Sequence, residues 1–134
     1  MEDIFVGRLM SSPVETVSPD TEAHVAAERM IDEGIGSVIV TDDEGVLAGI
    51  LTATDFVHIA AEQRWATDAT VEAYMTTDVT TTDANAEVRD IADLMIEEGF
   101  HHVPVVDDDE GVVGIVTTTD ITAYMSHVQT PSPS

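Results

Sequence analysis

The sequence contains no cysteine and no lysine, and only six of its 134 residues are aromatic. The absence of cysteine excludes disulfides, thiolate metal ligands and a cysteine nucleophile. No apolar run approaches the roughly 18 residues that a membrane span needs. The acidic start MEDIFVGRLM lacks the basic region and the cleavage site of a signal peptide. We therefore expect a soluble, cytoplasmic protein with no membrane partner.

Basic residues are also scarce. Four arginines stand against 27 acidic residues, which gives a formal net charge of −23. Without a basic patch the chain cannot neutralise phosphates along a nucleic acid, so this partner is excluded. The apolar content of 43% and the regular periodicity argue against disorder. We interpret the charge as adaptation to a very salty cytoplasm, where the screening length falls to about 3 Å.

An internal repeat runs through most of the chain. The heptapeptide GILTATD at residues 49–55 returns as GIVTTTD at residues 114–120. A gapless shift of 65 positions aligns the two copies from Met10 to Ala61, which places Met10 on Met75 and Gly49 on Gly114. Two copies are too few for a solenoid. We place one unit at residues 1–66, a second at residues 67–128 and a disordered tail at residues 129–134.

Each copy predicts the element order β-α-β-β-α, which makes the fold class α/β (α+β). In SPDTEAHVAAERMIDEG, capping residues precede apolar residues at helical spacing, and Gly34 ends the helix. The second copy repeats this pattern from Asp83 to Gly99. Two β-branched runs joined by an acidic turn follow in each copy, then a shorter helix. The leads VETV and VTTT, at residues 14–17 and 79–82, predict a strand before the first helix.

The repeated heptapeptide combines the end of a strand with the start of a helix. Helix N-termini leave backbone N–H groups unpaired and bind anions readily. Threonine hydroxyls can donate to phosphate oxygens, and an aspartate can accept two hydrogen bonds from a ribose diol. The same residues are also typical of an ordinary N-cap. Both interpretations stay open, since a threonine can cap the helix while the aspartate faces a ligand.

Residues 10–55 and 75–120 each resemble a cystathionine-β-synthase (CBS) domain. Each copy starts with M-[ST]-[ST], continues with a helix that ends in Glu-Gly, and closes on its heptapeptide; the second copy adds HHVPVVD. The resemblance extends to about residue 127. It implies a stand-alone Bateman module from a halophilic archaeon, with two CBS units packed in pseudo-twofold symmetry. It further implies a regulatory role, association into homodimers, and an unidentified effector protein as partner.

The resemblance also implies two clefts between the units that bind an adenine nucleotide or an adenosyl compound. The first cleft would use Ile35, Gly36 and Ser37 together with Thr117, Thr119 and Asp120. The second cleft would use Phe100, His101 and His102 together with Thr52, Thr54 and Asp55. The lead strands would also face the ligand, around Glu15 and Thr80.

The cationic residues that the family often carries in these motifs are missing. Ala53 and Thr118 stand inside the two heptapeptides, and the nearest basic candidates are His101 and His102. These histidines serve either the structure or a ligand phosphate, and either cleft is within their reach. In a chain of this charge, an AMP-like nucleotide or S-adenosylmethionine is easier to hold than ATP. We expect no required cofactor and no metal.

Catalysis finds little support in the sequence. There is no Walker motif and no H-E-x-x-H, and strand alternation points His101 and His102 to opposite faces. We therefore expect a protein that is not an enzyme: either a nucleotide sensor, or a dimerisation scaffold without a ligand. Apolar residues near and on the short helices either pack on their own sheet or mediate self-association. They are Phe56, Ile59, Trp65, Ile121, Tyr124 and Met125.

Overall fold

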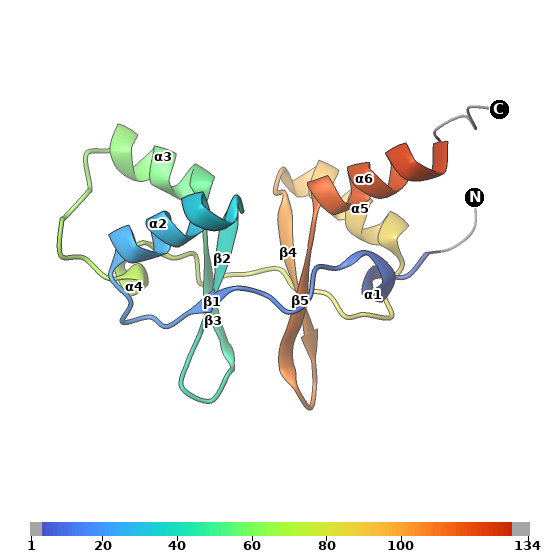
Figure 1. Cartoon of the computed structure of the whole chain (residues 1–134), viewed down its shortest axis with the longest axis horizontal. Helices are drawn as coiled ribbons and strands as arrows, with labels where there is room; N and C mark the ends of the chain where they lie inside the picture. The colour runs from blue at the N-terminus through green and yellow to red at the C-terminus, as the bar shows by residue number, and fades with distance from the viewer. Residues whose placement is uncertain (1–3, 130–134) are drawn as a thin grey trace. The chain divides into compact units, whose positions relative to one another are not determined.

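The computed structural model describes residues 4–129, which divide into two compact units (Figure 1). The first unit comprises residues 14–79. The second unit comprises residues 4–13 together with residues 80–129. Residues 4–13 of the first copy therefore belong to the unit built from the second copy, and residues 67–79 of the second copy belong to the unit built from the first; we call these two stretches the exchanged segments. This division differs from the boundary at residues 66 and 67 that the sequence suggested.

The first unit contains a three-stranded sheet in the order β1-β2-β3. Strand β1 pairs in parallel with β2, and β2 pairs antiparallel with β3. The expected order β-α-β-β-α is confirmed, and a further short helix follows it. The elements are β1 (Thr16–Val17), α2 (Ala23–Glu33), β2 (Ser37–Thr41), β3 (Leu47–Thr52), α3 (Ala53–Ala61) and α4 (Val71–Tyr74).

The second unit contains a two-stranded antiparallel sheet formed by β4 and β5. Its elements are α1 (Val6–Leu9), α5 (Val88–Glu98), β4 (His102–Asp107), β5 (Gly111–Thr117) and α6 (Thr118–Gln129). The strand expected at residues 79–82 shrinks to a single bridge between Thr82 and Val105. Thr82 stands where the first copy has the buried Val17, so the second lead has less apolar side chain to hold it on the sheet. Of the predicted tail, Gln129 ends α6, and residues 130–134 lie outside the described residues.

The long helices end as predicted but begin later. Gly34 and Gly99 adopt left-handed conformations, with φ of 65° and 77°, and close α2 and α5. The residues expected to cap α2 form a turn instead, in which the Ser18 amide donates to the Thr21 hydroxyl at 3.2 Å. Helix α2 starts only after Glu22, whose side chain makes no capping hydrogen bond.

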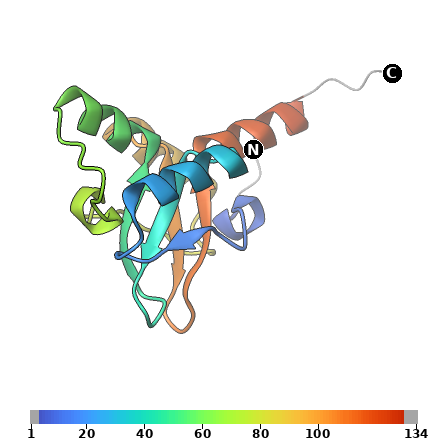
Figure 2. The same ribbon diagram turned by 60° about the vertical axis from the view of Figure 1, so that its left-hand side comes forward.

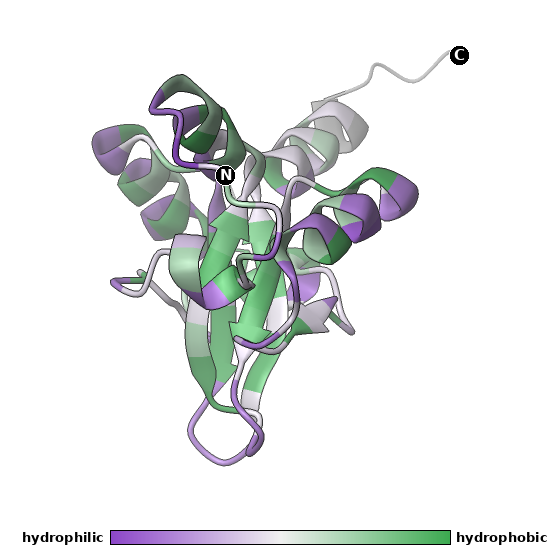
Figure 3. Cartoon of the chain, turned by 90° about the vertical axis from the view of Figure 1, so that its left-hand side faces the viewer, coloured by the Kyte–Doolittle hydropathy of each residue, from purple (hydrophilic) through white to green (hydrophobic). Residues whose placement is uncertain are grey.

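The acidic turns between the paired strands are built by aspartate side chains. Asp42 Oδ1 accepts hydrogen bonds from the amides of Glu44 at 2.9 Å and Val46 at 3.0 Å. Asp107 Oδ2 plays the same part in the second unit, accepting from the amides of Asp109 and Glu110. The strands are mostly hydrophobic, whereas a turn at the end of a hairpin is hydrophilic (Figure 3). The predicted acidic turns are confirmed, and their acidic residues are exposed.

The helices lie beside the strands (Figure 2). Each unit has a hydrophobic cluster of its own, to which both helices and strands contribute. In the first unit, Met30 of α2 and Phe56 of α3 pack with strand residues such as Val38 and Leu51. In the second unit, the cluster consists of Val6, Ile91, Met95, Val103, Val105 and Val116, with Ile121 packed against it. Val6 is fully buried there, so α1 is part of this core.

Two glycines allow the exchanged segments to lie directly on the strands. A Cβ atom on Gly49 would come within 2.7 Å of the Thr76 carbonyl oxygen, and one on Gly114 within 2.6 Å of the Met10 sulfur. The Met-[ST] pair of each copy therefore lies on a strand that ends in the other copy's heptapeptide. Backbone bridges join Thr76 to Ile50 and Ser11 to Ile115. The close approach explains why both heptapeptides begin with glycine.

Candidate functional site

In the first unit, Thr52 and Asp55 form a capping box at the start of α3. The Thr52 hydroxyl accepts from the Asp55 amide at 3.2 Å, and Asp55 Oδ2 accepts from the Thr52 amide at 2.9 Å. The capping interpretation of the first heptapeptide is therefore correct. One of the two carboxylate oxygens carries this cap, so capping does not exhaust the acceptor capacity of Asp55.

The second unit repeats this arrangement with additional contacts. Asp120 Oδ2 accepts from the Thr117 amide at 2.9 Å and from the Thr117 hydroxyl at 3.2 Å. The Asp120 amide in turn donates to the Thr117 hydroxyl at 3.2 Å. The other carboxylate oxygen, Oδ1, accepts from the Ser11 hydroxyl at 3.3 Å. Sequence reasoning missed Ser11, because 109 residues separate it from Asp120 and only the fold brings them together.

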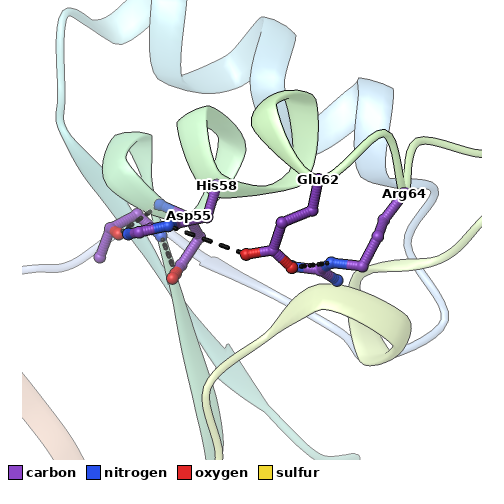
Figure 4. A network of polar contacts seen from close by, with 5 residues as sticks. Asp55, His58, Glu62 and Arg64 are labelled. Carbon is purple, nitrogen blue, oxygen red and sulfur yellow. Dashed lines mark hydrogen bonds and ion pairs between the residues drawn. The ribbon is translucent and has the colours of Figure 1, made fainter.

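Beyond the cap, α3 carries a chain of exposed polar contacts (Figure 4). Glu62 accepts from Arg64 at 2.7 Å and lies 3.9 Å from the Nδ1 atom of His58. Arg64 is therefore already paired with a carboxylate at the far end of the helix from Asp55. Arg29 is likewise engaged, since it donates to the Thr16 carbonyl at 3.0 Å.

The structure brings the predicted strand residues of each copy to the helix start of the same copy. Ser37 lies opposite Thr52 in the sheet, and the Gly36 carbonyl accepts from the Ala53 amide at 3.0 Å. In the second unit, His102 lies opposite Thr117. Ser37 is buried, Ile35 is half-buried, and Thr54, Thr80 and Thr119 are exposed. The two clefts that the resemblance implies combine residues of different units, and they stay predictions.

The two neighbouring histidines have different environments. His101 is exposed, whereas His102 is half-buried on β4. Burial lowers the pKa of His102 below its ordinary value of 6.5, the nearby charge of His101 lowers it further, and the Asp120 carboxylate opposes both effects. His102 is therefore mainly neutral at pH 7, so it offers little positive charge to a phosphate.

A mostly apolar pocket of about 380 Å³ opens in the second unit beside the start of α6. It contains two residues that the sequence had marked, Phe100 and His101. Its other lining residues are Ala92, Met95, Ile96, Gly99, Thr118, Ile121 and Thr122. Ala92, Met95 and Ile96 follow ordinary helical spacing in the sequence, so periodicity alone does not indicate a pocket beside them. Their arrangement suits a flat apolar group with a polar edge.

Residues 4–129 contain no group of three or more histidine, aspartate or glutamate side chains placed to hold a metal ion. None of the helices in this part of the chain combines the length and apolar character that crossing a bilayer requires.

Comparison with known proteins gives consistent matches over nearly the whole chain. The family model described as CBS domain matches twice, over residues 6–62 and 71–127. An uncharacterised 17.7 kDa protein of Acidianus ambivalens is 32% identical over 125 residues, which cover 93% of this chain and 75% of that protein. L-Aspartate semialdehyde sulfurtransferase of Methanocaldococcus jannaschii is 33% identical over 117 residues, which cover 87% of this chain but 22% of the enzyme.

Among solved structures, the CBS domain pair of protein MJ0100 superimposes with a TM-score of 0.87 and 30% sequence identity. The match covers 96% of this chain and 100% of that chain. That structure is a complex with 5′-methylthioadenosine and S-adenosyl-L-methionine. The α/β fold expected from the sequence is therefore that of known CBS domain pairs.

Proposed function

The chain belongs to the CBS domain family, and on this premise we propose that it is a regulatory module that senses an adenosine-containing ligand. The observation that carries the proposal is the pair of aspartates, Asp55 and Asp120. Both are half-buried at the start of a helix, and capping engages one oxygen of each. The other carboxylate oxygen can then accept from a ribose hydroxyl. The adenosyl ligands of the MJ0100 domain pair carry the same ribose.

We assign the ligand contacts to two clefts. In the first, Ile35, Gly36 and Ser37 enclose the base, and Thr117, Thr119 and Asp120 hold the ribose and its substituent. In the second, the corresponding residues are Phe100, His101 and His102 with Thr52, Thr54 and Asp55. Thr80, in the lead at residues 79–82, also contacts the ligand.

We propose that the ligand is AMP-like or adenosyl rather than ATP. Two of the four arginines, Arg29 and Arg64, are engaged with other groups. Burial keeps His102 mainly neutral at pH 7. A triphosphate would therefore meet a chain of net charge −23 with few cations to offset its own charge. A thioether or sulfonium head group, or a single phosphate, avoids most of this repulsion.

We further propose that the module works as a homodimer in a very salty cytoplasm and reports to an effector protein. Self-association is supported by Ile31 and Ile96, which occupy equivalent positions on α2 and α5. Their exposed fractions are 79% and 80%. Burying these two side chains in a contact between two copies would remove their apolar surface from water. Of the residues for which core packing and self-association stayed open, Ile59 is buried in its own unit, whereas Trp65 is 44% exposed.

Thermal unfolding with candidate ligands tests the proposal. The chain is heated in molar KCl with AMP, ATP, S-adenosylmethionine or 5′-methylthioadenosine. A ligand at 100 times its dissociation constant stabilises the fold by about 2.7 kcal/mol, so the shift is measurable. We expect a shift with AMP or an adenosyl compound that is smaller in Asp120→Ala. Asp108→Ala, which removes an exposed carboxylate of the acidic turn, should respond like the unsubstituted chain. Absence of a shift with every ligand would favour the alternative, a dimerisation scaffold without a ligand.

A further inference from the structure

The two aspartates differ in how many of their hydrogen-bond acceptor positions are occupied. A carboxylate offers about four such positions on its two oxygens. Among the described residues, three donors occupy Asp120: the Thr117 amide, the Thr117 hydroxyl and the Ser11 hydroxyl. The side chain of Asp55 accepts from the Thr52 amide. Asp120 therefore has less capacity left than Asp55, although the two heptapeptides are nearly identical in sequence.

The additional donor comes from a segment that is anchored independently of Asp120. Ser11 exchanges backbone hydrogen bonds of 2.8 and 3.1 Å with Ile115, and the Ser12 hydroxyl donates to the Val113 carbonyl at 2.9 Å. Nearer the start of the chain, the Gly7 amide donates to the Ala84 carbonyl at 2.9 Å. We call residues 4–12 the strap. It carries the Ser11 hydroxyl to the Asp120 oxygen that the helix cap does not use.

The matched position in the first unit behaves differently. Thr76 is the counterpart of Ser11 and makes the same kind of backbone bridge, to Ile50. Within residues 4–129, however, no hydrogen bond joins the Thr76 hydroxyl to Asp55. The contact between strap and aspartate is thus specific to the second unit, and it does not follow from the repeat.

We propose that Ser11 is a positioning residue that couples ribose binding at Asp120 to the strap. The inference rests on the proposed function. A ribose diol donates two hydrogen bonds, and Asp120 has about one acceptor position left, so the ligand displaces the Ser11 hydroxyl. Coupling of this kind is reciprocal: ligand binding loosens the strap, and loss of the Ser11 hydroxyl strengthens ligand binding. Asp55 accepts the same diol without displacing a neighbour.

The affinity test uses AMP and the variant Ser11→Ala in an Asp55→Ala background, which leaves one of the two proposed ribose sites. Removal of one competing hydrogen bond is expected to tighten AMP binding by about two- to tenfold. The matched variant Thr76→Ala in the same background should leave the affinity unchanged. Binding of 2′,3′-dideoxy-AMP, which lacks the diol, should not respond to Ser11→Ala. Unchanged or weaker AMP binding in Ser11→Ala would overturn the inference.

Hydrogen exchange of the unsubstituted chain gives a second test that does not depend on how a variant folds. With saturating AMP, the amides of Gly7 and Ser11 should exchange faster relative to those of α5, and 2′,3′-dideoxy-AMP should not have this effect. Strap amides that slow together with those of α5 would contradict the coupling. If AMP binds neither the unsubstituted chain nor the variants, the proposed function itself fails. If AMP binds with an affinity that Ser11→Ala does not change, only the coupling fails.

Discussion

A single threonine hydroxyl fixes the start of each helix that follows a heptapeptide. The Thr52 and Thr117 hydroxyls each accept a hydrogen bond from the amide of the residue three positions later. The Asp55 and Asp120 carboxylates in turn accept a hydrogen bond from the threonine amides. The last threonine of each motif, Thr54 or Thr119, is exposed. The first and the last threonine of one motif thus have separate parts, since the first caps the helix and the last leaves its hydroxyl exposed.

Thr52→Ala is expected to lower the free energy of unfolding by about 1 kcal/mol, because the Asp55 amide loses its cap. Thr54→Ala is the matched control and should change it by less than about 0.5 kcal/mol, since it removes an exposed side chain. Urea unfolding followed by circular dichroism measures both. Equal effects of the two variants would contradict the assignment of capping to the first threonine.

The half-buried His102 should make stability depend on pH. Its pKa is lowered in the folded state, so below pH 6.5 the unfolded chain binds more protons than the folded chain. The contribution of this group is therefore complete above pH 6.5 and is lost as the pH falls toward the folded pKa. In an NMR titration of the imidazoles, His101→Gln should raise the pKa of His102, and Asp120→Asn should lower it. A pKa of His102 at or above 6.5 would contradict this account.

At the scale of elements, local chemistry predicted most of each unit. The glycines that end α2 and α5, the hairpin turns and the helices α3 and α6 follow from residues close together in the chain, whereas the four-residue helices α1 and α4 were not predicted. The exchange of segments could not be predicted in this way. Met10 and Met75 occur in the same motif, and the motif does not indicate which strand it will join. The bridge at Thr82 and the contact between Ser11 and Asp120 also depend on packing between distant residues. The sequence therefore predicted the candidate aspartates but not the difference between them.

Because of the exchange, we expect each of two equivalent valines to stabilise the unit that is built from the other copy. Val6 and Val71 are both fully buried, the first in the second unit and the second in the first unit. Replacement by alanine should lower the local stability of the host unit by about 2 kcal/mol. In hydrogen exchange, Val6→Ala should reduce protection mainly in α5 and β4, and Val71→Ala mainly in α2 and β2. The reverse pattern would show that each exchanged segment stays with its own copy.

At the scale of the whole molecule, net charge governs the conditions under which the units fold. A chain of charge −23 repels itself strongly at low ionic strength, and salt weakens this repulsion. The screening length falls from about 10 Å at 0.1 M to about 3 Å at 1 M. The same repulsion acts on an anionic ligand, so stability and nucleotide affinity should both respond to salt.

We expect the midpoint of thermal unfolding to rise steeply as KCl increases from 0.1 to 1 M, and more slowly above that range. Above 1 M KCl the screening of the charge repulsion is nearly complete, whereas a simple salting-out effect would continue to grow with concentration. Differential scanning calorimetry at increasing KCl concentrations distinguishes charge screening from salting-out. A midpoint that is independent of KCl would contradict the interpretation of the charge as adaptation to salt.

The most direct test of the account is calorimetric titration of 5′-methylthioadenosine into the chain in molar KCl, because this ligand carries ribose but no phosphate. The account predicts saturable binding that is abolished in the double variant Asp55→Ala/Asp120→Ala, with circular dichroism confirming that the variant stays folded. The control Asp43→Ala/Asp108→Ala removes two exposed turn carboxylates at matched positions and should bind normally. Undiminished binding by the first double variant would contradict the claim that these aspartates hold the ribose.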